Sequence, residues 1–276
     1  MYPEALAYLT CPHDPEATLR LASRARWSAD GEIISGRLRC PMCGTRYWIN
    51  GGVADLLGPL AMPATLVQLL NDLPPTAWGY ERAWRPHALT LLAGEPFAYE
   101  RELPLIVGLA APERGGLCVD VACSNGLYAR ALARAQGGVS GHVIGVDHAL
   151  PMLKQARAYA RAEGLRISFV RAKAQALPIA AGAAAVLTMG GALNELGALD
   201  VALRELRRTL APVGRCAMMS LSRAATVQGR LLQGSLRMTG VVFPTLEELN
   251  RRTTLAGLRL RAQWRYQVVV VSLLTR

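Results

Sequence analysis

The chain lacks the features that would direct it into or across a membrane. None of its apolar runs reaches the ~18 residues of a membrane-spanning helix. Residues 1–10 have neither the basic start nor the long apolar stretch of a secretory signal. With hydrophobic residues at 51% and charged residues at 18%, the 276 residues can bury a substantial core. We therefore expect a cytoplasmic protein without a membrane span.

Lysine is almost absent, so the net charge of +11 comes from arginine. Only Lys154 and Lys173 are lysines, and residues 111–276 have 22 basic and nine acidic side chains. Residues 1–60 have six of each. Arginine-rich surfaces often bind nucleic acid or acidic substrates. However, the chain has no run of five basic residues and only 6% aromatic residues, so a solvated arginine surface is the simpler interpretation and RNA stays open as a partner.

A G-x-G-x-x-G run is missing where the other features predict a nucleotide site, which argues against a dinucleotide-binding fold. An apolar run at 117–119 predicts a buried strand that ends at Asp120, and a helical pattern begins at Leu127. A second apolar run, 142–146, ends at Asp147. The turn between the first strand and the helix is built mostly from small residues, Ala122, Cys123, Ser124 and Gly126.

This arrangement predicts a nucleotide-cofactor site. Small residues let a ligand approach the backbone, and the start of a helix offers free N–H groups. An acid about 20 residues further on suits a ribose hydroxyl. Asp147 follows Gly126 by 21 residues and meets that condition.

The order Asp-x-small-x-small-x-Gly at 120–126 resembles motif I of the class I S-adenosylmethionine-dependent methyltransferases. Later segments are similar to that family in the same order, and the ubiquinone-biosynthesis-like (methyltransferase-11) members are the nearest in pattern. These segments are 145–153, 174–178, 184–196 and 206–215. The resemblance covers residues 111–276 and implies an α/β fold, a doubly wound, Rossmann-like sheet of seven strands.

The resemblance also implies which residues bind S-adenosylmethionine. Asp120 lies near the methionine amino group in the family, and Asp147 takes the two ribose hydroxyls. His148 and Met152 flank the adenine. The remaining residues expected at the cofactor are Ala122, Cys123, Ser124, Gly126, Lys173, Ala174, Met189 and Gly190. Glycine is usual at positions 122 and 124, so this loop is expected to be stiffer and more crowded.

Lys173 departs from the family pattern. The family has an aspartate there, which accepts a hydrogen bond from the adenine amino group, whereas lysine can only donate. Two interpretations follow. Either the Ala174 backbone N–H and apolar packing hold the adenine while Lys173 faces solvent, or the pocket no longer binds S-adenosylmethionine tightly.

Three of the six cysteines lie near the N-terminus, outside the predicted core strands. Cys40 and Cys43 form a Cys-x-x-Cys knuckle, and thiolates at this spacing can hold one zinc ion. The segment resembles the zinc ribbon found ahead of some methyltransferase domains, including ribosomal RNA guanine methyltransferases. Cys11 is a third expected ligand, and either His13 or Asp14 is the fourth. The alternative is a degenerate ribbon that folds without metal.

The pattern divides the chain into three parts. Residues 1–58 are expected to form a small β-rich, zinc-ribbon-like domain, 59–110 a helical linker or cap, and 111–276 the methyltransferase domain. In the middle part, Tyr80, Trp84 and His87 are candidate pocket residues, although an aromatic packing face explains them equally well. The sequence does not define an oligomeric state.

The acceptor is expected to be small and largely apolar. The segment 221–243 is rich in aliphatic residues and lies where the family builds a wall of the acceptor pocket, which favours a quinone, polyketide or pigment precursor. The Asn/Asp-Pro-Pro-aromatic motif typical of amino-methylating nucleic-acid enzymes is missing after residue 188. Two alternatives stay open, a ribosomal or transfer RNA methyltransferase and a methyltransferase-fold protein that transfers no methyl group. No catalytic residue is assigned, and the candidate bases are His87, His148, Asn194 and Glu195.

Overall fold

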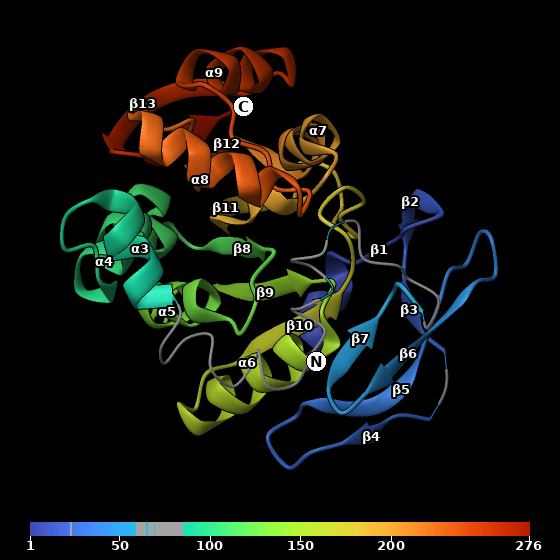
Figure 1. The fold of residues 1–276 in the computed structure, drawn as a ribbon. Helices are drawn as coiled ribbons and strands as arrows, with labels where there is room; N and C mark the ends of the chain where they lie inside the picture. The colour runs from blue at the N-terminus through green and yellow to red at the C-terminus, as the bar shows by residue number, and fades with distance from the viewer. Residues whose placement is uncertain (23, 59–64, 66–68, 70–84) are drawn as a thin grey trace.

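Seven strands of the methyltransferase part form one mixed sheet in the computed structural model (Figure 1), which describes residues 1–22, 24–58, 65, 69 and 85–276. Their spatial order is β10-β9-β8-β11-β12-β14-β13. The first five are parallel, and β14 runs antiparallel to both of its neighbours. The bounds are β8 Gly116–Val121, β9 Gly141–Asp147, β10 Ile167–Arg171, β11 Ala184–Gly190, β12 Leu210–Leu221, β13 Arg259–Tyr266 and β14 Val269–Thr275. The predicted doubly wound, seven-stranded sheet is confirmed.

Helices cover both faces of this sheet because its central strands are apolar on both sides. Along β8, Leu117, Val119 and Val121 pack into one core cluster, whereas Cys118 belongs to the other. The first cluster includes residues of α7 (Leu199–Thr209) and α9 (Leu246–Leu255). The second includes residues of α3 (Arg85–Ala93), α4 (Tyr99–Ala110), α5 (Leu127–Gln136) and α6 (Leu150–Ala162).

The other helical elements of the described residues are one α-helix and three 3-10 helices. They are α8 (Val227–Arg237) and the 3-10 helices η1 (Pro3–Ala7), η3 (Pro112–Arg114) and η4 (Ala192–Glu195). Among the helices of the described residues, none is both long enough and apolar enough to span a membrane. Tyr80 and Trp84 lie outside the described residues, and His87 is exposed on α3.

The N-terminal segment continues the methyltransferase sheet. Its strand β7 (Val53–Asp55) pairs in parallel with β10, so that Asp55 lies opposite Arg171. Antiparallel strands β6 (Arg46–Asn50), β5 (Ile33–Arg39) and β3 (Arg20–Leu21) extend the sheet further, and β4 (Arg26–Trp27) also pairs with β5. A separate hairpin joins β1 (Thr10–Cys11) to β2 (Asp14–Thr18). The division at residue 58 stays a prediction, and the backbone pairing crosses it.

A buried carboxylate fastens this segment to α6. Glu32 is only 1% exposed and accepts two hydrogen bonds of 2.7 Å from the Arg157 guanidinium. The Met1 amino group donates to the same carboxylate at 3.0 Å, and Arg161 adds a contact of 3.2 Å. Burial alone would raise the pKa of Glu32, but the hydrogen bonds from Arg157 and the Met1 amine hold it below its usual range.

His142 makes the stability of the sheet dependent on pH. It is 5% exposed on β9, and its Nε2 atom lies 2.8 Å from the Ser168 hydroxyl on β10. Burial lowers the pKa of His142 from 6.5 to about 4, so the folded protein keeps this ring neutral where the unfolded chain binds a proton. Stability is therefore complete above pH 6.5 and falls as the pH drops toward 4.

We expect His142 to account for about 2 kcal/mol of the stability lost between pH 7.5 and pH 5. Urea unfolding at both pH values measures the loss, and His142→Asn should reduce it by that amount. The same substitution at the exposed His87 is the control, and its stability should depend on pH as that of the wild type does. Equal pH dependence in the wild type and His142→Asn would refute the assignment.

Candidate functional site

Asp120 lies one residue before the end of β8 and is fixed from two sides. It is 1% exposed, and its Oδ1 accepts a hydrogen bond of 2.9 Å from the Thr188 hydroxyl on β11. Its Oδ2 accepts one of 2.9 Å from the backbone N–H of Ala129 in α5. The carboxylate thus ties the strand, the neighbouring strand and the helix together at the carboxyl edge of the sheet, where open α/β folds bind ligands.

The loop between β8 and α5 holds two non-glycine residues in the left-handed conformation. Ala122 has a φ of 53° and Ser124 a φ of 50°, close to the 78° of Gly126. Side chains are disfavoured there, because the Cβ atom approaches the following carbonyl oxygen. These are the positions at which the family has glycine. The loop keeps the backbone path of a glycine-rich loop although its first two small positions hold side chains.

Replacing Ala122 by glycine should stabilise the protein by roughly 0.5–1 kcal/mol, because relief of the left-handed conformation outweighs the added freedom of the unfolded chain. Ser124→Gly should act in the same direction. The matched control is Ala158→Gly at an exposed position inside α6, which should destabilise by about 1 kcal/mol. Urea midpoints compare the variants, and a loss of stability in Ala122→Gly would show that the loop is not strained.

Asp147, at the end of β9, accepts a hydrogen bond from the loop between β8 and α5. It is 6% exposed, its Oδ2 accepts from the Ser124 N–H at 2.8 Å, and its Oδ1 accepts from the Ala149 N–H at 2.8 Å. A carboxylate has about four acceptor positions. Oδ2 can accept a further hydrogen bond from a ribose hydroxyl, and His148 Nδ1 lies 3.3 Å from Oδ1. The carboxylate is thus an acceptor of the kind that the ribose of S-adenosylmethionine requires.

The other residues expected near the nucleoside surround this carboxylate. The Nδ1 atom of His148 lies 3.3 Å from Asp147 Oδ1, and Met152 Sδ lies 3.5 Å from the Ser124 hydroxyl. Met152 is buried, and His148 is about one-fifth exposed. Ala174 is buried behind the end of β10, whereas the side chain of Lys173 is exposed. An exposed Lys173 is the arrangement required if the backbone of Ala174 holds the adenine.

The Asn194 amide closes the end of β11 and is bound to backbone groups through both its nitrogen and its oxygen. Met189 is fully buried and Gly190 partly exposed. Beyond them, Asn194 donates to the carbonyl oxygens of Leu221 and Val242 at 2.7 and 2.6 Å, and its Oδ1 accepts from the Leu221 N–H at 2.7 Å. Asn194 therefore fastens the segment 221–242 to the end of β11 and is a structural residue.

Arg171 is a site residue that the sequence did not reveal. Its Nε atom donates to the His148 carbonyl oxygen at 2.9 Å, next to Asp147, the residue expected to bind the ribose. Its Nη1 atom donates to Asp55 Oδ2 and to the Gly58 carbonyl oxygen, both at 3.1 Å. The guanidinium thus links the last N-terminal strand to the cofactor loop. In the sequence, an arginine at the end of an apolar strand cannot be distinguished from an ordinary surface residue. Only the pairing of β7 with β10 shows that Arg171 links the two segments.

The three N-terminal cysteines meet at one point. Their sulfur atoms all lie within 4.8 Å of one another, and Cys11 Sγ is 3.6 Å from Cys43 Sγ. Hydrogen bonding to the Thr45 hydroxyl lowers the pKa of the Cys43 thiol to about 7. Three thiols at this separation fit the sulfur-rich tetrahedral site that zinc prefers. His13 is exposed, and within the described residues neither it nor Asp14 joins this group.

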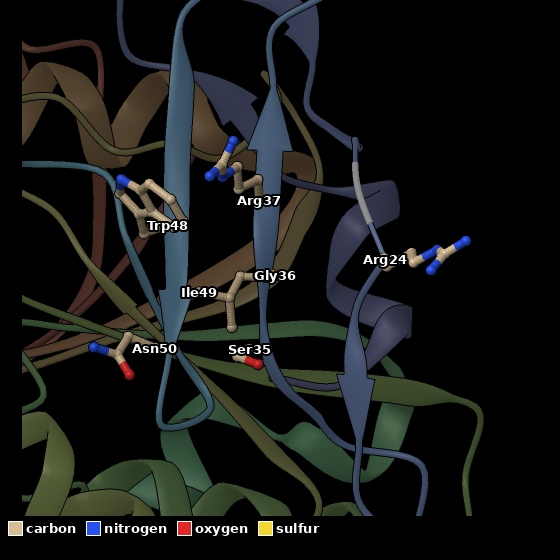
Figure 2. A pocket seen from close by; sticks show the side chains of 7 residues that line it. All are labelled: Arg24, Ser35, Gly36, Arg37, Trp48, Ile49 and Asn50. Carbon is tan, nitrogen blue, oxygen red and sulfur yellow. The ribbon is translucent and has the colours of Figure 1, made fainter.

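Among the described residues, two clefts lie away from the loops that follow β8 and β9. One, of about 720 Å³, opens on β5 and β6 of the N-terminal segment (Figure 2). There the Arg37 guanidinium lies 4.2 Å from the centre of the Trp48 ring. The other, of about 740 Å³, lies between the start of α7 and residues 237–244. Its walls include Val242, whose carbonyl oxygen accepts a hydrogen bond from Asn194.

Comparison with known proteins agrees with this geometry. Residues 118–214 match the family described as "Methyltransferase domain". The chain is 32% identical over 188 residues to a 2-phytyl-1,4-naphtoquinone methyltransferase of Trichormus variabilis, which covers 67% of this chain and 72% of that protein. It is 34% identical over 151 residues to a demethylmenaquinone methyltransferase of Thermus thermophilus, covering 55% and 59%. The solved structure of the YcgJ protein of Bacillus subtilis has a similar fold, with a TM-score of 0.54, 20% identity and coverage of 60% and 72%.

Proposed function

Because the chain belongs to the class I S-adenosylmethionine-dependent methyltransferases, we propose that it methylates a ring carbon of a naphthoquinone-type acceptor in its reduced, quinol form. The observation that carries this proposal is the similarity to two enzymes named for naphthoquinone and menaquinone substrates. Quinones were the first of the expected acceptor classes. The same similarity favours them over polyketide or pigment precursors and over the RNA alternative.

The site supports this chemistry through binding and positioning. S-adenosylmethionine supplies an electrophilic methyl group, so the protein has to align the acceptor carbon with it and exclude water. Asp147 would hold the ribose, and Asp120 fixes the loop that faces the methionine end. When bound, S-adenosylmethionine would supply the methyl group and leave as S-adenosylhomocysteine, and the proton lost from the ring carbon would be released to bulk water after the transfer.

Apolar side chains that an aromatic quinol could contact line the cleft beside α7, together with the charged Asp200, Arg204, Arg237, Glu248 and Arg252. Val241 and Phe243 are 7% and 4% exposed and lie at the cleft beside α7. The adjoining Val242 N–H donates to the Asn194 carbonyl oxygen at 2.9 Å, which fixes this wall against the carboxyl end of β11. Burial of an aromatic ring against such side chains is favourable at about 25 cal/mol per Å² of apolar area.

The direct test is methyl transfer from isotopically labelled S-adenosylmethionine to a reduced, demethylated menaquinone with a short side chain. The proposal predicts labelled product from the wild type and none from Asp147→Ala. Total RNA offered under the same conditions should take up no label. Labelled RNA together with unlabelled quinol would replace the proposal with the RNA alternative.

We also propose that Cys11, Cys40 and Cys43 hold one structural zinc ion. The convergence of three thiols supports it, and the fourth ligand is left to His13, Asp14 or a solvent molecule. Elemental analysis of the purified protein should find about one zinc per chain, in keeping with a single tetrahedral site, and a Cys40→Ser/Cys43→Ser double variant should bind none. A wild type that folds and contains no metal would favour the degenerate ribbon.

A further inference from the structure

Helix α8 is attached to the protein by its polar side and turns its apolar side outward. Its one buried residue is Gln233, whose side chain accepts from the Ala224 N–H at 2.8 Å and donates to the Ser222 carbonyl oxygen at 3.0 Å. By contrast, Leu231 and Leu232 are 71% and 57% exposed. The other exposed apolar residues of this stretch are Val227, Leu236, Met238 and Val242. A helix that faced only water and its own protein would have the opposite arrangement.

The outward face forms an apolar strip of two groups of residues, with uncharged polar residues between them. At about 100° per residue, Val227, Leu231 and Met238 lie within about 40° of one another around the helix. Leu232 and Leu236 lie about 100° and 140° further around the helix than Leu231. No charged residue lies between these two groups, because the positions that separate them are Gln228 and Ser235. Exposed apolar strips of this kind mark a surface that has a partner.

The charged residues of the segment that contains the strip all have one sign. Residues 221–243 contain three arginines, Arg223, Arg230 and Arg237, and no acid. All three side chains are exposed. Such a surface attracts an anionic partner. A second copy of this chain would bring three arginines against three arginines in a symmetric contact, and like charges would repel it.

We propose that α8 lies on the surface of a membrane that contains anionic phospholipid, with its leucines in the interface and its arginines among the headgroups. An apolar face flanked by arginine is the pattern of helices that lie in the plane of a bilayer. The inference rests on the proposed function, because an acceptor with an apolar chain is held in a bilayer. Asn194 joins this segment to the end of β11, so the same surface would present the acceptor side of the sheet to the lipid.

Sedimentation with vesicles tests this surface without cofactor or quinol, so its outcome is independent of methyl transfer. The wild type should co-sediment with vesicles of phosphatidylcholine and phosphatidylglycerol at a ratio of 3:1, and at least tenfold less with phosphatidylcholine alone. Leu231→Gln/Leu232→Gln should reduce binding to the mixed vesicles at least tenfold. The matched control, Leu255→Gln, changes a leucine that is 73% exposed on α9 and should bind as the wild type does.

Binding of S-adenosylhomocysteine checks that the double variant is folded. A wild type that stays in solution with the mixed vesicles, or a double variant that binds them unchanged, overturns the proposal. Sedimentation equilibrium tests the alternative that a second copy of the chain binds the strip. A wild-type dimer that Leu231→Gln/Leu232→Gln converts to a monomer would assign the strip to a second copy of the chain instead.

Discussion

Glu32→Gln is expected to lower the free energy of unfolding by about 3 kcal/mol, since removing one partner of a buried ion pair strands the other. The carboxylate is 1% exposed and accepts from Arg157, Arg161 and the Met1 amine. The amide can accept on one side only, and its NH2 group would face a donor. Urea unfolding followed by tryptophan fluorescence measures the loss. Because the folded pKa of Glu32 is lowered, its contribution is present at neutral pH and is lost as the pH falls below about 4.5.

Glu4→Gln is the matched control for this variant. Glu4 also pairs with an arginine, Arg166, at 2.7 Å, but its side chain is 45% exposed. An exposed pair contributes at most about 1 kcal/mol. If Glu32→Gln lost no more stability than Glu4→Gln, the buried carboxylate would not be the anchor between the N-terminal segment and α6.

Arg171→Met is expected to weaken S-adenosylhomocysteine binding at least tenfold, which corresponds to about 1.4 kcal/mol. The guanidinium fixes the His148 carbonyl oxygen beside Asp147, and methionine keeps only the apolar part of the side chain. Asp55→Asn should have a smaller effect in the same direction, because it retains an acceptor for Arg171 and removes the charge. Calorimetric titration gives the dissociation constants.

Arg166→Met tests whether any arginine beside β10 has this effect. Arg166 directly precedes β10 and donates to the Asp30 carbonyl oxygen at 2.8 Å, far from the cofactor loop in the bonding network. Its loss should leave the dissociation constant unchanged. If Arg171→Met lowered stability while the dissociation constant stayed that of the wild type, Arg171 would support the fold alone and would not position the cofactor loop.

The seven-stranded sheet could be predicted from the sequence because β8 and β9 are local apolar runs and the later segments resemble those of the family in the same order. β13, Arg259–Tyr266, is not an apolar run and is predicted from the resemblance alone. Asp120, Gly126 and Asp147 follow from the same logic, since the acid and the small residues have to lie at the ends of those strands. The positive φ angles of Ala122 and Ser124 agree with the expectation of a crowded loop.

Contacts between distant parts of the chain could not be predicted. Pairing of β7 with β10 joins residues more than 110 positions apart, and no local pattern marks it. The roles of Arg171, Glu32 and Asn194 all depend on such pairings. The zinc ligands, the cofactor contacts and the cytoplasmic location stay predictions.

The central claim is that this chain binds S-adenosylmethionine through Asp147 although Lys173 replaces the usual acid. Calorimetric titration of S-adenosylmethionine and S-adenosylhomocysteine into the wild type and Asp147→Ala tests it most directly. We expect micromolar binding to the wild type and none to the variant. No binding to the wild type at millimolar ligand would contradict it and would identify Lys173 as the first residue to change.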